Sequence, residues 1–174
     1  MTDGSKELDI DQIAERTGIS ARGLRYVVDY DLLNAVVPWF RALHAKRRGI
    51  ARTFPPYFAF LLCLAASLRT ANLSREQLQT ALQLLAEWLK LVTKGQDYAQ
   101  RLYPLFDAAD KLVLEIGDGE FLHAGRKSRT RSGLLPAGEL PWTHLSAKQS
   151  AADGYVPLVV SRIDVAEIRR RLLP

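Results

Sequence analysis

The sequence predicts a mainly α-helical fold with a small β component. Three observations support this class: short amphipathic helical patterns near the N-terminus, a leucine repeat in the middle of the chain, and strand patterns on either side of a glycine-containing turn nearer the C-terminus. They divide the chain into three expected parts. These parts are an N-terminal domain over residues 1–73, a linking helix over 74–95 and a small α+β domain over 96–174.

Length and composition are those of a globular chain. The 174 residues are 48% hydrophobic and 25% charged, which argues against a wholly disordered protein. Lys and Arg number 24 and Asp and Glu 19, and the resulting net charge of +5 permits an anionic partner. One cysteine excludes a disulfide framework and a multi-cysteine metal site within one chain. Because the start is polar and acidic, we expect no signal peptide and a soluble, cytoplasmic protein.

Two short helices are expected at the N-terminus. Small or apolar residues follow the i, i+3, i+4, i+7 spacing of an amphipathic helix at Ile10, Ile13, Ala14 and Thr17. Asp9 is expected to cap this helix and Gly18 to end it in a left-handed conformation. Ser20 is a suitable cap for a second helix over residues 21–30. Two helices joined by so short a turn are typical of a helix-turn-helix, whose second helix enters the DNA major groove.

The second helix has an apolar face and a basic face. The residues expected to face inward are Leu24, Val27 and Val28. Arg22 and Arg25 share the outward face, with Tyr26 beside them. Arginine bonds guanine edges or phosphates, and tyrosine hydroxyls often bond phosphate oxygens. On spacing alone, the same face is equally typical of a solvated helix.

A basic cluster without acidic residues follows the helix pair. Its members are Arg41, Lys46, Arg47, Arg48 and Arg52. Residues 50–54 are expected to form a short strand, so the cluster is typical of a basic wing that reaches phosphates beside the recognition helix. Because each neutralised phosphate releases counterions, such binding weakens steeply with salt. A solvated turn is the alternative.

In this order, the residues resemble the MerR family of winged-helix transcription regulators. The segments that carry the resemblance are residues 9–14, 18–20, 23–26, 31–33, 48–54 and 68–78. The resemblance implies DNA contacts from Arg22, Arg25 and Tyr26 in the helix and from Arg48 and Arg52 in the wing. Lys46 and Arg47 are added on charge alone. The chain departs from the family in lacking the cysteines of its metal sensors, and Val27 stands where a second aromatic is usual.

The most apolar stretch, residues 53–68, predicts a buried core helix. It is shorter than the roughly 20 residues that a bilayer span needs. Pro55 and Pro56 suit the first turn of a helix. Cys63, in the middle of the stretch, is expected to be a small buried residue rather than a reactive thiol.

A leucine repeat follows Ser74. Its members, at the spacing of a coiled-coil seam, are Leu78, Leu82, Leu85, Leu89 and Val92. A second stripe beside it makes the apolar face wide. The repeat predicts a dimerisation helix, in keeping with the dimers of the resembled family. Burial inside a single domain is the alternative that two heptads leave open.

The C-terminal part predicts a small α+β domain. The expected elements are a helix over 98–109 limited by Pro104, a hairpin of strands 112–116 and 120–124, a long loop over 125–154, an edge strand over 155–161, and a final helix capped by Asp164 with Glu167. Residues 126–131 contain four basic side chains. This run is equally typical of an anion-binding loop and of a basic loop without a role.

The sequence contains no recognisable catalytic group. The histidines His44, His123 and His144 have neither metal-ligand spacing nor a nucleophile partner, and no cofactor motif is present. We therefore expect, instead of an enzyme, a sequence-specific, dimeric regulator that binds double-stranded DNA, with its C-terminal domain used for oligomerisation, effector sensing or protein contact. An excisionase-like accessory factor for recombination and an adaptor that has lost DNA binding are the alternatives.

Overall fold

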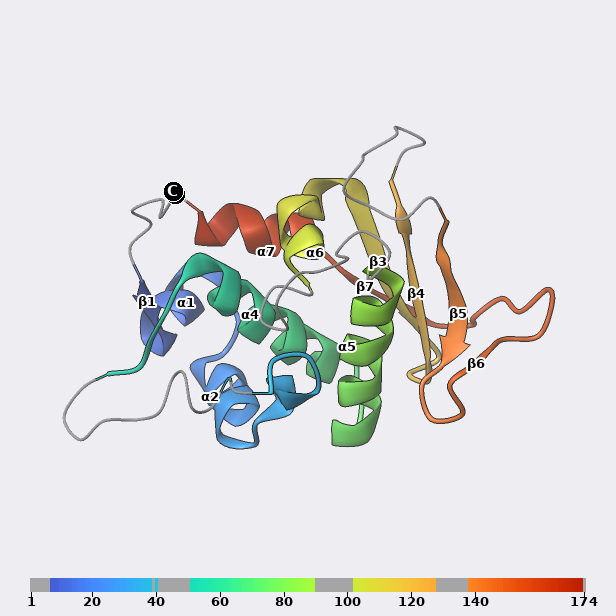
Figure 1. Cartoon of the computed structure of the whole chain (residues 1–174), viewed down its shortest axis with the longest axis horizontal. Coiled ribbons are helices and arrows are strands. Elements are labelled where there is room, and N and C mark those ends of the chain that lie inside the picture. Colours follow the sequence, from blue (N-terminus) through green and yellow to red (C-terminus); the bar gives the residue numbers. More distant parts are fainter. Residues whose placement is uncertain (1–6, 39, 41–50, 90–101, 128–137, 174) are drawn as a thin grey trace.

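The computed structural model describes residues 7–38, 40, 51–89, 102–127 and 138–173. These residues form helices that lie on one side of a five-stranded antiparallel sheet (Figure 1). The architecture therefore belongs to the α+β class, in agreement with the mainly helical chain and small β component expected from the sequence.

Both expected N-terminal helices are confirmed as α1 (Ile10–Thr17) and α2 (Ala21–Asp29). The Asp9 carboxylate accepts a hydrogen bond from the Gln12 amide at 2.8 Å, and the Gln12 side chain accepts one from the Asp9 amide. Gly18 ends α1 with a φ of 75°, and the Ser20 hydroxyl accepts a bond from the Gly23 amide at 3.1 Å. Local capping chemistry thus sets the turn between the helices.

The strand expected over residues 50–54 is shorter in the structure. It is β2 (Thr53–Phe54), and it pairs antiparallel with β1 (Leu8–Asp9). A 3₁₀ helix, η1 (Leu32–Ala35), follows α2. The residues expected in the wing, Lys46, Arg47 and Arg48, lie outside the described residues.

Helix α4 (Pro56–Thr70) is the core helix expected from the apolar stretch. Pro56 lies in its first turn, and most of its other residues are buried. Burial raises the pKa of the Cys63 thiol to about 12, which agrees with a small buried residue. Within the described part of the chain, no helix is long and apolar enough to cross a membrane.

Helix α5 (Arg75–Leu89) carries the leucine repeat into the chain's own core. Leu78, Leu82, Leu85 and Leu89 are each at most 1% exposed. They pack beside η1 and α4. These four leucines are therefore buried inside one chain, as the single-domain alternative expects, and are not available to a second subunit. Val92 lies outside the described residues.

The C-terminal sheet has the strand order β6-β5-β4-β3-β7. Its strands are β3 (Leu112–Gly117), β4 (Phe121–Arg126), β5 (Leu140–His144), β6 (Gln149–Ser150) and β7 (Val160–Ile163). The β3–β4 hairpin confirms the expected one. The long loop expected over 125–154 is wrong, because it contains β5 and β6. The expected strand 155–161 begins later, at Val160, and β7 does lie at an edge.

Three short helical segments connect the sheet to the rest of the core. They are α6 (Tyr103–Asp107), η3 (Ala109–Lys111) and α7 (Val165–Leu172). Asp164 caps α7 as expected, because its carboxylate accepts a bond from the Glu167 amide at 3.0 Å. Helix α7 packs on α1 and α4 (Figure 1). Buried residues from the three parts that the sequence suggested therefore form one hydrophobic core.

Candidate nucleic-acid interface

Helix α2 presents the two faces that its sequence predicts. Leu24, Val27 and Val28 are at most 2% exposed and pack in the core. Arg22 and Arg25 are exposed on the opposite face, and Tyr26 is half-buried between them and the core. The helix therefore has a solvent-facing surface that carries the predicted contact residues.

Arg25 is paired within the chain. Its Nη2 lies 2.6 Å from Oδ1 of Asp11 on α1, with 51% and 76% of the two side chains exposed. An exposed pair of this kind contributes little to stability, because water already solvates both charges well before they pair. The Arg25 guanidinium is accordingly held against α1 by Asp11.

Arg52 also lies against a carboxylate. Its Nη1 is 3.6 Å from Oδ1 of Asp29 at the end of α2, and only 22% of the Arg52 side chain is exposed. Its Nε is buried and has no hydrogen-bond partner within the described residues. A cavity of about 260 Å³ is bordered by both of these ion pairs. On this side of α2, each arginine faces an aspartate.

A groove of about 700 Å³ lies on another side of α2, between the helix and the C-terminal end of α4. We call it the α2–α4 groove. Its lining residues are Gly18, Ile19, Ser20, Arg22, Gly23, Tyr26, Tyr30, Ala66, Ser67, Arg69 and Thr70. None of these lining residues is acidic. The groove brings the predicted Arg22 and Tyr26 together with Arg69, which the sequence did not single out.

Arg69 lies over an aromatic ring. Its guanidinium carbon is 3.5 Å from the centroid of the Tyr26 ring, and the Tyr30 ring centroid lies 4.2 Å from that of Tyr26. This cation–π contact orients the guanidinium while its N–H groups remain available at the edge. Within the described residues, neither Arg69 nor Arg22 has a carboxylate partner.

The chemistry of the groove suits a sugar–phosphate strand. Two guanidinium groups offer fixed positive charge, and Ser67 adds a hydroxyl group, whereas the Thr70 hydroxyl already donates to the Ser67 carbonyl oxygen at 2.7 Å. Among the described residues, no cluster of His, Cys, Asp or Glu could hold a metal ion. With its two guanidinium groups, the lining favours binding of an anion.

The second basic run begins far from this groove. Arg126 ends β4, and Lys127 follows it in an exposed position. Helix α4 lies between the sheet and α2 (Figure 1). The described part of the run therefore does not join the groove, and residues 128–131 lie outside the described residues.

No protein-family model matches the chain, and no match was found among curated proteins or solved structures.

Proposed function

We propose that the protein is a sequence-specific DNA-binding transcription regulator, with α1 and α2 as a winged helix-turn-helix. The observation that carries the proposal is the α2–α4 groove. It places two arginines without carboxylate partners in the described structure, Arg22 and Arg69, beside an exposed recognition-type helix. That combination of a basic, hydroxyl-lined groove and an exposed helix face matches what a DNA duplex presents, namely a phosphate strand beside base edges.

Each basic residue then has a distinct role. Arg22 lies early in α2, where helix-turn-helix proteins contact bases. Arg69 contacts a phosphate, with Tyr26 holding its guanidinium. Arg25 exchanges Asp11 for a base edge or a phosphate, which costs little because the pair is exposed.

The wing and the dimer complete the proposal. Lys46, Arg47, Arg48 and Arg52 grip the flanking phosphates and supply much of the salt dependence. Two copies bind paired half-sites, as helix-turn-helix proteins generally do. Since the leucines of α5 fill the core, the dimer contact uses a different surface.

Selection from a random duplex library tests the proposal. The purified full-length protein should enrich one sequence motif, and a fluorescence anisotropy titration should then give tighter binding to that motif than to its scrambled version. Binding should weaken steeply between about 0.05 and 0.2 M salt. Failure to enrich any motif, with equal affinity for all duplexes, would remove the regulator from consideration.

Two other candidates are separated by the same experiment. The pairing of Arg25 with Asp11 and of Arg52 with Asp29 favours an adaptor, because this side of α2 is already neutralised like an ordinary solvated surface. An adaptor would bind no duplex. An accessory factor for recombination would enrich a motif that lies at attachment sites instead of promoters.

A further inference from the structure

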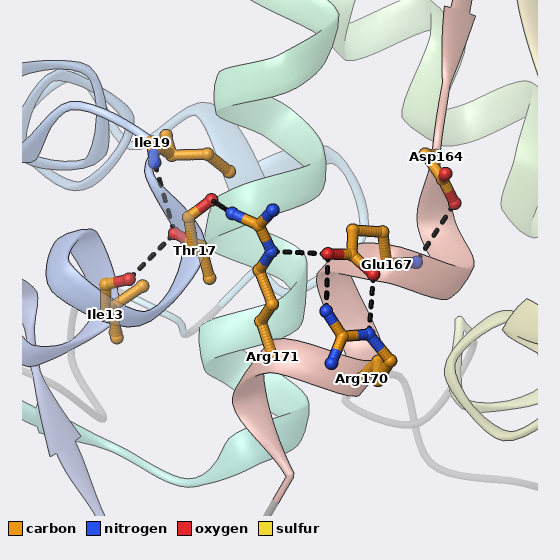
Figure 2. Close-up of polar contacts among 7 residues, drawn as sticks. All are labelled: Ile13, Thr17, Ile19, Asp164, Glu167, Arg170 and Arg171. Atoms are coloured by element: carbon orange, nitrogen blue, oxygen red, sulfur yellow. Dashed lines mark hydrogen bonds and ion pairs between the residues drawn. The ribbon is translucent and has the colours of Figure 1, made fainter.

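The C-terminal ends of α1 and α7 meet in the structure (Figure 2). Helix α1 ends at Thr17 and α7 ends at Leu172. The last carbonyl groups of a helix have no partner within the helix and carry a partial negative charge. Two such ends repel each other unless cations lie between them.

At this junction, one arginine of each helix donates a hydrogen bond to a carbonyl oxygen of the other helix. Arg171 of α7 donates from Nη1 to the Thr17 carbonyl oxygen at 2.8 Å. Arg16 of α1 donates from Nη1 to the Leu172 carbonyl oxygen at 3.4 Å. Each guanidinium thus satisfies a carbonyl of the opposite helix and offsets its negative end. We call these residues, with Glu167, the α1–α7 junction.

Glu167 orients Arg171, which makes the shorter of the two hydrogen bonds between the helices. Its Oε1 lies 2.6 Å from Nε of Arg171, and its carboxylate also accepts two hydrogen bonds from Arg170 (Figure 2). Hydrogen bonds from Arg170 and Arg171 lower the pKa of Glu167 to about 2. The carboxylate is therefore ionised at neutral pH and holds the Arg171 guanidinium toward α1.

Thr17 connects this contact to the turn that follows it. Its hydroxyl donates to the Ile13 carbonyl at 2.7 Å and accepts from the Ile19 amide at 3.3 Å. The carbonyl of the same residue is held by Arg171, so the last residue of α1 is fixed from two directions (Figure 2). Ile19 lines the α2–α4 groove, and Arg22 follows three residues later.

We propose that Arg171, oriented by Glu167, is a positioning residue for the helix-turn-helix. It makes the C-terminal helix part of the DNA-binding unit, because it fixes the turn that sets the direction of α2. The inference about DNA rests on the proposed function. The inference about the turn rests only on the α1–α7 junction.

Three variants of the full-length chain test the proposal. Arg171→Ala removes the bond to α1, Arg171→Lys keeps a charged donor, and Arg170→Ala is the matched control because Arg170 pairs with the same Glu167 without contacting Thr17. Hydrogen–deuterium exchange measures the amides of residues 17–20 against those of the β3–β4 hairpin. Anisotropy measures affinity for the enriched duplex and its salt dependence.

For Arg171→Ala we expect faster exchange at 17–20 with an unchanged hairpin. Affinity should fall about tenfold, the value of one charge-assisted hydrogen bond, with the same salt slope. Arg171→Lys should recover most of both losses, and Arg170→Ala should resemble the wild type. If Arg171→Ala does not fold, Arg171→Lys is compared with Arg170→Ala instead. The amides of residues 17–20 should then exchange slightly faster in Arg171→Lys and at the wild-type rate in Arg170→Ala.

Unchanged exchange at 17–20 would overturn the proposal. A reduced salt slope for Arg171→Ala would also overturn it, because Arg171 would then contact phosphate directly. If the wild type binds no duplex, the proposed function fails, and the exchange rates decide separately whether Arg171 positions the turn.

Discussion

The exposed face of helix α2 has arginines along both of its edges, and the two edges differ in their electrostatic state. On one side, Arg25 faces Asp11 and Arg52 faces Asp29. On the other side, Arg22 and Arg69 line a groove without acidic lining residues. A basic residue in the sequence is therefore only a potential contact, and its tertiary neighbours decide whether its charge is available.

The difference has a consequence for binding. A groove guanidinium that has no carboxylate partner among the described residues can bind phosphate without first losing one. A paired guanidinium must release its aspartate, so part of its interaction with DNA is offset. We therefore expect the groove to supply more of the affinity than the Asp11–Asp29 side.

Removal of Arg22 should give the largest effect. Arg22→Ala should cost about 1–3 kcal/mol at the enriched sequence, because an arginine that bonds a base edge is lost. The scrambled duplex should lose less, which anisotropy titrations on both duplexes would measure. Lys148→Gln is the control, since it removes one positive charge from the β5–β6 turn, at the other end of the molecule from α2 (Figure 1). Equal losses for the two variants would contradict the role of Arg22.

Replacement of Arg69 should weaken all duplexes alike. Arg69→Ala removes the proposed phosphate contact, so the slope of log affinity against log salt should become shallower by about 1. The tyrosine beneath it separates two effects. Tyr26→Phe keeps the ring and should retain most of the affinity. Tyr26→Leu removes the cation–π contact and should lower the affinity with a smaller change in the salt slope than Arg69→Ala, because the charge of Arg69 remains. A salt slope that is unaltered in Arg69→Ala would exclude Arg69 from the phosphate contacts.

Local chemistry made much of the fold predictable. Asp9, Gly18 and Ser20 set the ends of α1 and α2 through their own caps, and those caps occur in the structure as expected. The strand β5 was not predicted because it contains Pro141, and the two residues of β6 are polar and exposed. Such short strands form because a neighbouring strand offers each a partner, β4 for β5 and β5 for β6, which no local pattern reveals.

The candidate interface was predictable only in part, for the same reason. Arg22, Arg25 and Tyr26 follow from the helical period of α2. Arg69 does not, because its contact with Tyr26 depends on how α4 packs against α2. The pairing of Arg25 with Asp11 likewise requires the angle between two helices. The leucine repeat of α5 was recognised from its spacing, but the spacing did not reveal its partner, because a dimer seam and a core helix share the same repeat.

Release of Arg25 should have a smaller effect of opposite sign. Asp11→Asn breaks the ion pair and removes a negative charge from the proposed DNA-binding side, so affinity should rise about two- to fivefold, as an exposed pair of about 1 kcal/mol or less allows. Glu15→Gln is the matched control, because it removes an exposed negative charge from the same helix without freeing an arginine. A rise of the same size in both variants would assign the effect to net charge alone.

The smallest expected effect concerns acid stability at the α1–α7 junction, where a carboxylate again holds a guanidinium. Because folding lowers the pKa of Glu167 from 4.5 to about 2, this group stabilises the folded state fully above pH 4.5, and the contribution is lost as the pH falls toward 2. When thermal melts are recorded between pH 4.5 and about pH 2, the midpoint temperature should fall further in the wild type than in Glu167→Gln, because the glutamine has no carboxylate to titrate. Arg170→Ala should fall between them, because one of the two arginines that lower the pKa remains. Parallel curves for wild type and Glu167→Gln would mean that the carboxylate is solvated as it is in the unfolded chain, and that Arg171 reaches Thr17 without its help.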